Sequence, residues 1–111
     1  MHKRMIELFI VDIFVAIDRI NRNLNNITNP EEFESLNENI FDAIMRELEI
    51  IGEASKYIIK NEMYVKVSST DWQKIINFRN IITHEYFGVD LDIAFNVTKN
   101  EIPKLEKELP N

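Results

Sequence analysis

The chain has 111 residues, no cysteine and a formal net charge of −6 at pH 7. This length suits a single domain, 1–111, with a modest hydrophobic core, and a hydrophobic share of 45% excludes a disordered chain. The absence of cysteine excludes disulfides and thiolate metal sites and favours a reducing cytosol, so we expect a cytoplasmic protein. The apolar stretch 6–17 is interrupted by acidic residues and is too short to span a bilayer, so we expect a buried helix of a soluble protein there.

The first half of the chain carries apolar residues at helical spacing and predicts two long helices. The first is expected from Lys3 to Leu24 and the second from about Asn39 to Asn61. Between them, Thr28-Asn29-Pro30-Glu31-Glu32 predicts the start of a short helix, with a capping side chain, a proline and two acids at the positive end of the dipole. The expected core positions are Ile6, Phe9, Ile10, Ile13, Phe14, Ile17, Ile20, Ile40, Ile44, Leu48, Ile51, Ala54, Ser55 and Ile58.

A connector and a third helix are expected next. Val65-Lys66-Val67-Ser68-Ser69 is typical of a connecting segment, and Thr70-x-x-Gln73 has the pattern of a capping box. The helix that this box would begin carries the chain's most informative residues.

The last part of the chain predicts a fourth main helix. Gly88 marks a break, and Asp90 is a suitable N-cap for a helix from Leu91 to about Leu109. Pro103 should end or kink that helix about one turn early, because proline lacks the N–H that the helix needs. Four main helices joined by short loops predict an all-α fold, an up-and-down four-helix bundle.

Eight consecutive residues, Arg79-Asn80-Ile81-Ile82-Thr83-His84-Glu85-Tyr86, concentrate groups that bind phosphate and move protons. At about 100° per residue, the arginine, asparagine, threonine, histidine and tyrosine fall within an arc of about 160°, opposite the apolar side chains. Glu85 falls on the apolar side, so the helix frays there or Glu85 has a buried partner. Asn80 and His84 are i, i+4 neighbours, which would let the amide orient the imidazole.

An arginine and a histidine in this arrangement suit the cleavage of RNA without a metal. The guanidinium of Arg79 would place positive charge on the pentavalent transition state, and the imidazole of His84 would transfer protons near neutrality. One histidine cannot easily perform both proton transfers. A symmetric dimer that brings two copies of the segment together would supply the second histidine.

Each of these residues also has a purely structural interpretation. A lone histidine such as His84 is more often structural than catalytic, and Arg79 could form a surface ion pair of little energetic consequence with Glu53 or Glu85. Asn80 is as easily a solvated amide as a phosphate ligand. A phenol is protonated near neutrality and is a poor base, so Tyr86 by itself indicates a core or interface tyrosine.

The pattern Arg79-x-x-x-x-His84-x-Tyr86 resembles the signature of the HepT-like toxins of the HEPN superfamily. Ile50-Ile51-Gly52-Glu53-Ala54 resembles the IGEA segment that this family carries in mid-chain, and Trp72 stands where the family usually has a tryptophan. The resemblance extends over nearly the whole chain.

The resemblance implies a HEPN-type bundle that forms a homodimer with its catalytic cleft at the interface. It implies a ribonuclease, an RNA endonuclease toxin of a type VII toxin–antitoxin pair, with Arg79 and His84 as catalytic residues and Asn80 in support. It also implies a partner, an MntA-type nucleotidyltransferase antitoxin that adenylylates Tyr86. An adenylate phosphate beside Arg79 would neutralise the guanidinium and block the cleft.

The acidic net charge supports a different interpretation, because proteins that hold RNA are usually basic, at least locally. Either RNA contact is confined to a small patch around Arg79, or the chain is a catalytically inert dimeric adaptor subunit that helps a nucleotidyltransferase recognise its target. Burial of the arginine under Glu53 or Glu85 would favour the adaptor. We expect no cofactor, no membrane or DNA partner, and no metal site, since the two histidines are distant and carboxylates at ligand spacing are lacking.

Overall fold

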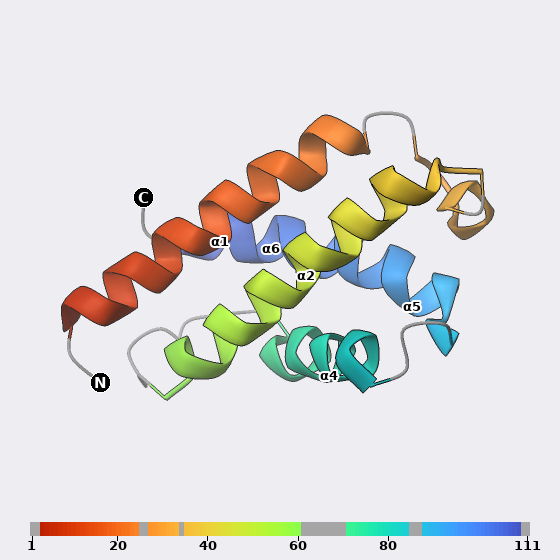
Figure 1. The fold of residues 1–111 in the computed structure, drawn as a ribbon. Helices are drawn as coiled ribbons and strands as arrows, with labels where there is room; N and C mark the ends of the chain where they lie inside the picture. Colours follow the sequence, from red (N-terminus) through yellow and green to blue (C-terminus); the bar gives the residue numbers. More distant parts are fainter. Residues whose placement is uncertain (1–2, 25–26, 34, 61–70, 85–87, 110–111) are drawn as a thin grey trace.

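All the regular secondary structure is helical in the part of the chain that the computed structural model describes, residues 3–24, 27–33, 35–60, 71–84 and 88–109. The all-α prediction is confirmed for these residues, and none of their helices is long and apolar enough to cross a membrane. In chain order the elements are α1 (Lys3–Asn23), the 3-10 helix η1 (Pro30–Phe33), α2 (Glu38–Ile58), α4 (Trp72–His84), α5 (Leu91–Asn96), the π-helical segment η3 (Val97–Glu101) and α6 (Ile102–Glu108) (Figure 1).

Helices α1 and α2 lie side by side and bury the apolar stripes that the sequence predicts (Figure 1). Of the predicted core positions only Phe9, Phe14 and Ile40 remain half-buried, and the ring of Phe9 stacks on that of Tyr57 at 4.9 Å. Burying each large aliphatic side chain contributes about 1.5–3 kcal/mol, so this pair of helices forms much of the core. Helix α2 ends at Ile58, three residues before the predicted end.

The predicted helix start after the first long helix is present as η1. The side-chain oxygen of Asn29 accepts a hydrogen bond from the backbone N–H of Glu32 at 3.2 Å. The Glu32 carboxylate reaches back to the hydroxyl of Thr28 at 2.6 Å and the amide of Asn29 at 2.8 Å. These reciprocal bonds satisfy polar groups at the start of the helix, and the segment then buries Phe33.

Helix α4 is capped one residue later than the sequence suggests. Thr70 lies outside the described residues, and the observed capping contact comes from Asp71, whose carboxylate accepts the backbone N–H of Lys74 at 3.0 Å. The backbone N–H of Asp71 in turn donates to the buried carboxylate of Glu101 in η3 at 3.1 Å. The C-terminal helical segment therefore fixes the beginning of the helix that carries Arg79.

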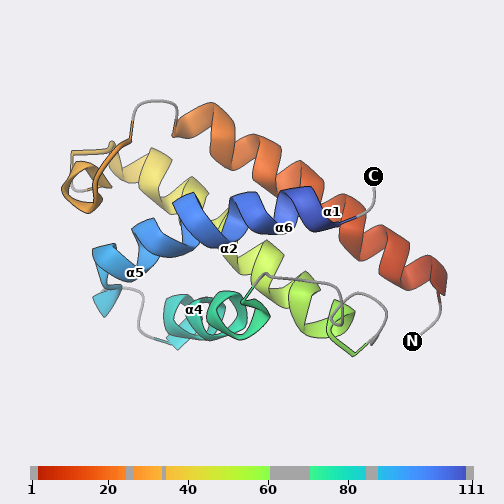
Figure 2. The same cartoon turned by 180° about the vertical axis from the view of Figure 1, so that it is seen from behind.

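The C-terminal segment runs as α5, η3 and α6, which lie behind the α1–α2 pair in Figure 1 and in front of it in Figure 2. Asp90 caps it as predicted, accepting the backbone N–H groups of Asp92 at 2.8 Å and Ile93 at 3.3 Å. Pro103 does not end the helix, which continues to Glu108. The distortion expected at the proline is a π-helical turn, because a wider turn just before Pro103 accommodates its missing N–H and its ring.

Helix α2 occupies the middle of the fold, packed against α1 on one side and α4 on the other (Figures 1 and 2). The buried face of α4, including Trp72, Ile75, Phe78 and Ile82, turns into the core. Its opposite face is therefore left to carry polar groups alongside α2.

Candidate functional site

Helices α2 and α4 approach each other closely at Gly52. A Cβ atom at this position would lie 2.8 Å from Cγ of Arg79, closer still to Cβ of Arg79, and 3.3 Å from the backbone oxygen of Ile75. No side chain fits there unless the helices separate, so the glycine is required by the contact itself. The stem of Arg79 consequently packs directly on the backbone of α2.

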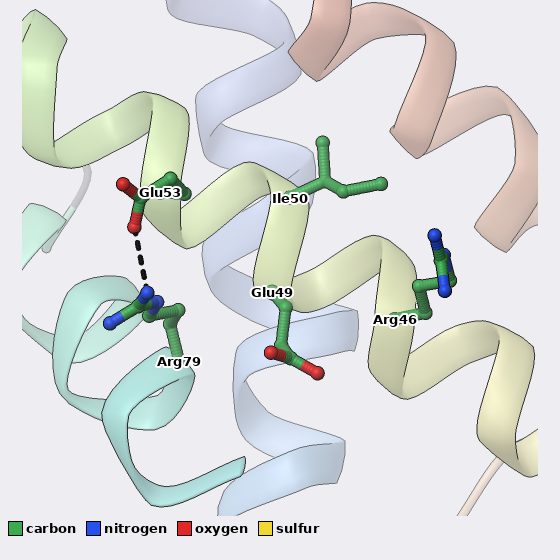
Figure 3. A pocket seen from close by; sticks show the side chains of 5 residues that line it. All are labelled: Arg46, Glu49, Ile50, Glu53 and Arg79. Atoms are coloured by element: carbon green, nitrogen blue, oxygen red, sulfur yellow. Dashed lines mark ion pairs between the residues drawn. The ribbon is translucent and has the colours of Figure 1, made fainter. Parts of the chain in front are cut away.

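An open groove of about 370 Å³ lies beside this contact (Figure 3). Four residues of α2 line it at i, i+3, i+4 and i+7 spacing, which places them on one face of the helix, and Arg79 lines it from α4. The α2 residues are Arg46, Glu49, Ile50 and Glu53. The groove therefore carries two guanidinium groups and two carboxylates.

Arg79 is held from two sides and is still accessible. Its Nη2 lies 2.9 Å from Oε2 of Glu53, and its Nη1 donates to the side-chain oxygen of Asn80 at 3.0 Å (Figure 3). Oε2 of Glu53 is buried and receives no aligned hydrogen bond, so the Glu53 contact is an ion pair rather than a directed N–H bond. A guanidinium has five N–H donors, and with the Arg79 side chain 25% exposed, some of them remain available to a ligand in the groove.

The polar face predicted for this helix is confirmed, since Asn80, Thr83 and His84 are exposed while the apolar face is buried. The Thr83 hydroxyl lies 3.0 Å from the backbone oxygen of Arg79 and 3.3 Å from Oε2 of Glu49, so it links the two helices. His84 is the last residue of α4 and is not part of the groove lining.

Asn80 has a different described partner from the one that its spacing suggests. Its side-chain oxygen accepts from Arg79 rather than from the imidazole of His84, as far as the described residues show. Glu85 and Tyr86 lie outside the described residues, so the expectations for them concern a part of the chain without described geometry.

Two residues of the groove, Arg46 and Glu49, lie outside the motif that the sequence singles out. Both precede Glu53 on the same face of α2, by seven and four positions. This spacing is a signal that could have identified them once Glu53 was considered as a partner of Arg79. The alternative of an ion pair between Arg79 and Glu53 is observed.

Comparison with known sequences identifies the family to which this helical fold and its groove-lining arginine belong. The profile of the HepT-like family, described as ribonuclease HepT-like, matches residues 13–111. The chain therefore belongs to the HepT-like ribonuclease family.

Relatives in archaea agree with this assignment. A candidate RNase of Methanocaldococcus jannaschii is 35% identical over 109 residues, which cover 98% of this chain and 97% of the relative. A second candidate RNase of the same organism is 36% identical over 110 residues, which cover 97% of this chain and 87% of the relative. A candidate ribonuclease HepT of Thermococcus cleftensis is 39% identical over 64 residues, 58% of this chain and 57% of the relative. No solved structure matches the chain.

Proposed function

We propose that this chain is a metal-independent RNA endonuclease and the toxin of a HepT/MntA-type pair. The observation that carries the proposal is the accessible guanidinium of Arg79 on the wall of an open groove, in a chain of the HepT-like ribonuclease family. A guanidinium in this position can bind a backbone phosphate of RNA in bidentate fashion. The exposure of Arg79 favours this proposal over the adaptor alternative, because Arg79 is paired with Glu53 without being buried under it.

In the proposed reaction Arg79 stabilises the negative charge that develops on the phosphorus oxygens when the 2′-hydroxyl attacks. Asn80 supports this role by accepting a hydrogen bond from Nη1 of Arg79, which restrains the guanidinium. His84, exposed at the end of α4, protonates the leaving 5′-oxygen. The products are a 2′,3′-cyclic phosphate and a 5′-hydroxyl.

The proposal includes the assembly and the regulation that the family resemblance implies. The chain would be a single domain of HEPN type that forms an up-and-down four-helix bundle and a homodimer in the cytoplasm. An MntA-type nucleotidyltransferase would transfer AMP from ATP to the hydroxyl of Tyr86 and release pyrophosphate. A phosphate seven residues from Arg79 could compete with RNA for the guanidinium and silence the enzyme.

The first test is incubation of the purified chain with RNA in EDTA, beside Arg79→Ala and His84→Ala. We expect the wild type to cleave RNA and each variant to lose roughly 10²-fold or more in rate, the usual loss for one charge-stabilising or proton-transferring group. Matched controls are Arg22→Ala, which removes an exposed arginine of α1, and His2→Ala, which removes the other histidine. Both controls should cleave at the wild-type rate.

Failure of the wild type to cleave, with no adenylate on Tyr86 by mass spectrometry after incubation with the partner and ATP, would refute the toxin proposal. Cleavage by Arg79→Ala and His84→Ala at the wild-type rate would refute Arg79 and His84 as catalytic residues. If the wild type is inert, the adaptor subunit becomes the better hypothesis.

A further inference from the structure

Glu49 is the one carboxylate of the groove that no positively charged side chain holds, among the residues that the structure describes. We propose that Glu49 is the general base of RNA cleavage, the group that removes the proton from the attacking 2′-hydroxyl. The inference rests on the proposed ribonuclease function and names a catalytic residue for it.

The position of Glu49 supports this role. It lies on the same face of α2 as Glu53, one turn earlier, and its carboxylate points into the groove between Arg46 and Arg79 (Figure 3). Its Oε2 lies 3.3 Å from the Thr83 hydroxyl, which also lies 3.0 Å from the backbone oxygen of Arg79, so the two acceptors share one proton, while Oε1 has no described partner. One carboxylate oxygen is thus oriented by α4 and the other remains free to accept a proton.

The neighbouring carboxylate, Glu53, is unsuited to the same task. Its Oε2 is buried against Arg79 at 2.9 Å and also lies 3.7 Å from Nζ of Lys56. A carboxylate oxygen held by two cations is not free to approach a substrate hydroxyl. The two glutamates therefore divide the work, since Glu53 holds the phosphate-binding arginine and Glu49 faces the open groove.

Glu49 is also linked, through Thr83, to the helix that carries the other residues proposed for the reaction. Thr83, its hydrogen-bond partner, directly precedes His84 and is one helical turn from Arg79. A phosphate bound to Arg79 in the groove would therefore lie beside the carboxylate of Glu49 on the α2 side.

The proposed step balances in atoms and charge. Glu49 takes the proton of the 2′-hydroxyl as the 2′-oxygen forms its bond to phosphorus. The bond from phosphorus to the 5′-oxygen breaks, and the leaving oxygen takes a proton from the imidazolium of His84. Glu49 and one histidine then supply the two proton transfers, so the chemistry no longer requires a second histidine.

The test compares two RNA substrates, one natural and one in which sulfur replaces the leaving 5′-oxygen. A thiolate leaves without protonation, so the sulfur substrate does not need the acid but still needs the base. On natural RNA we expect Glu49→Gln to lose roughly 10²–10⁴-fold in kcat with little change in KM. On the sulfur substrate His84→Ala should regain most of the wild-type rate, whereas Glu49→Gln should stay slow.

Controls separate the role of the carboxylate from folding and from net charge. Glutamine keeps an oxygen that can accept the Thr83 hydroxyl, and Glu7→Gln on α1 removes one exposed negative charge outside the groove. Glu49→Asp, which keeps a carboxylate, should retain more activity than Glu49→Gln. All variants should unfold at the wild-type temperature.

Two results would overturn the inference. Wild-type cleavage of natural RNA by Glu49→Gln would show that the carboxylate is dispensable. Rescue of Glu49→Gln by the sulfur substrate would identify Glu49 as the acid instead of the base. If the Arg79 and His84 variants lose activity as expected while Glu49→Gln does not, only this inference falls. An inert wild-type chain would remove the proposed function as well.

Discussion

Arg79 depends on its neighbours for position more than for charge. The glycine at 52 lets the arginine stem lie against the backbone of α2, and Glu53 and Asn80 then restrain the guanidinium at 2.9 Å and 3.0 Å. A pair as exposed as Glu53 and Arg79 contributes at most about 1 kcal/mol to stability. Its main effect is to aim the guanidinium along the groove.

Gly52→Ala is expected to destabilise the fold and to weaken cleavage together. The added Cβ has no space beside the Arg79 stem, so α2 and α4 must separate or the arginine must move. Overpacking of this kind typically costs about 1–3 kcal/mol. Urea unfolding would give the loss of stability, and the rate of RNA cleavage would give the effect on Arg79.

Gly88→Ala is the matched control for this substitution. A Cβ at Gly88 meets nothing within 4 Å, and neither glycine has a positive φ. An alanine there restricts the unfolded chain and should leave stability unchanged or raise it by about 0.4–1 kcal/mol. Equal losses at both positions would show that the α2–α4 contact is not what Gly52 serves.

At the level of elements, helical periodicity was sufficient to predict most of α1 and α2. Their stripes fall on buried positions because an amphipathic helix can bury only one face. Local chemistry also predicted Asp90 as a cap, since a short side chain before a helix accepts its free N–H groups. These features are recorded within a few neighbouring residues of the sequence.

The groove itself could not be predicted in the same way. Arg46 and Glu49 acquire a role only because Arg79 of α4, at least 30 residues later in the chain, packs on α2 at Gly52. The π-helical turn before Pro103 is similar, because the sequence indicates a distortion but not how the chain absorbs it. Both depend on tertiary packing, which a periodic pattern does not encode.

Asp90→Ala tests the cap at the start of α5. Alanine leaves the N–H groups of Asp92 and Ile93 without their side-chain acceptor, so we expect a loss of about 1 kcal/mol in the free energy of unfolding. Asp90→Asn keeps an acceptor oxygen in the same place and should remain close to the wild type. If thermal or urea unfolding shows equal losses for both variants, the charge and not the hydrogen bonds stabilises this helix.

The whole molecule carries a formal charge of −6, and this limits how it can hold RNA. A protein that neutralises many phosphates loses affinity steeply as salt rises, with a slope of about −0.7 for each contact to a single strand. The groove offers two guanidinium groups, Arg79 and Arg46, and the latter forms no ion pair with another described residue. We therefore infer a short binding site with few phosphate contacts, surrounded by a surface that repels RNA.

The number of phosphate contacts can be measured from the binding of a 2′-O-methyl RNA, which cannot be cleaved, across a salt series. We expect a shallow slope of about −1.4 per chain, from two contacts, and a slope shallower by about 0.7 for Arg46→Ala. Arg22→Ala makes the same change in net charge but removes an arginine that is paired with Asp18 at 2.6 Å on α1, so its slope should match the wild type.

If the two variants had identical slopes, Arg46 would not contact phosphate. A wild-type slope several times steeper would place RNA on a far larger surface than the groove. A shallow slope that depends on Arg46 would explain how an acidic chain binds RNA, because the two arginines act at short range where the repulsion of the remaining surface is screened by salt.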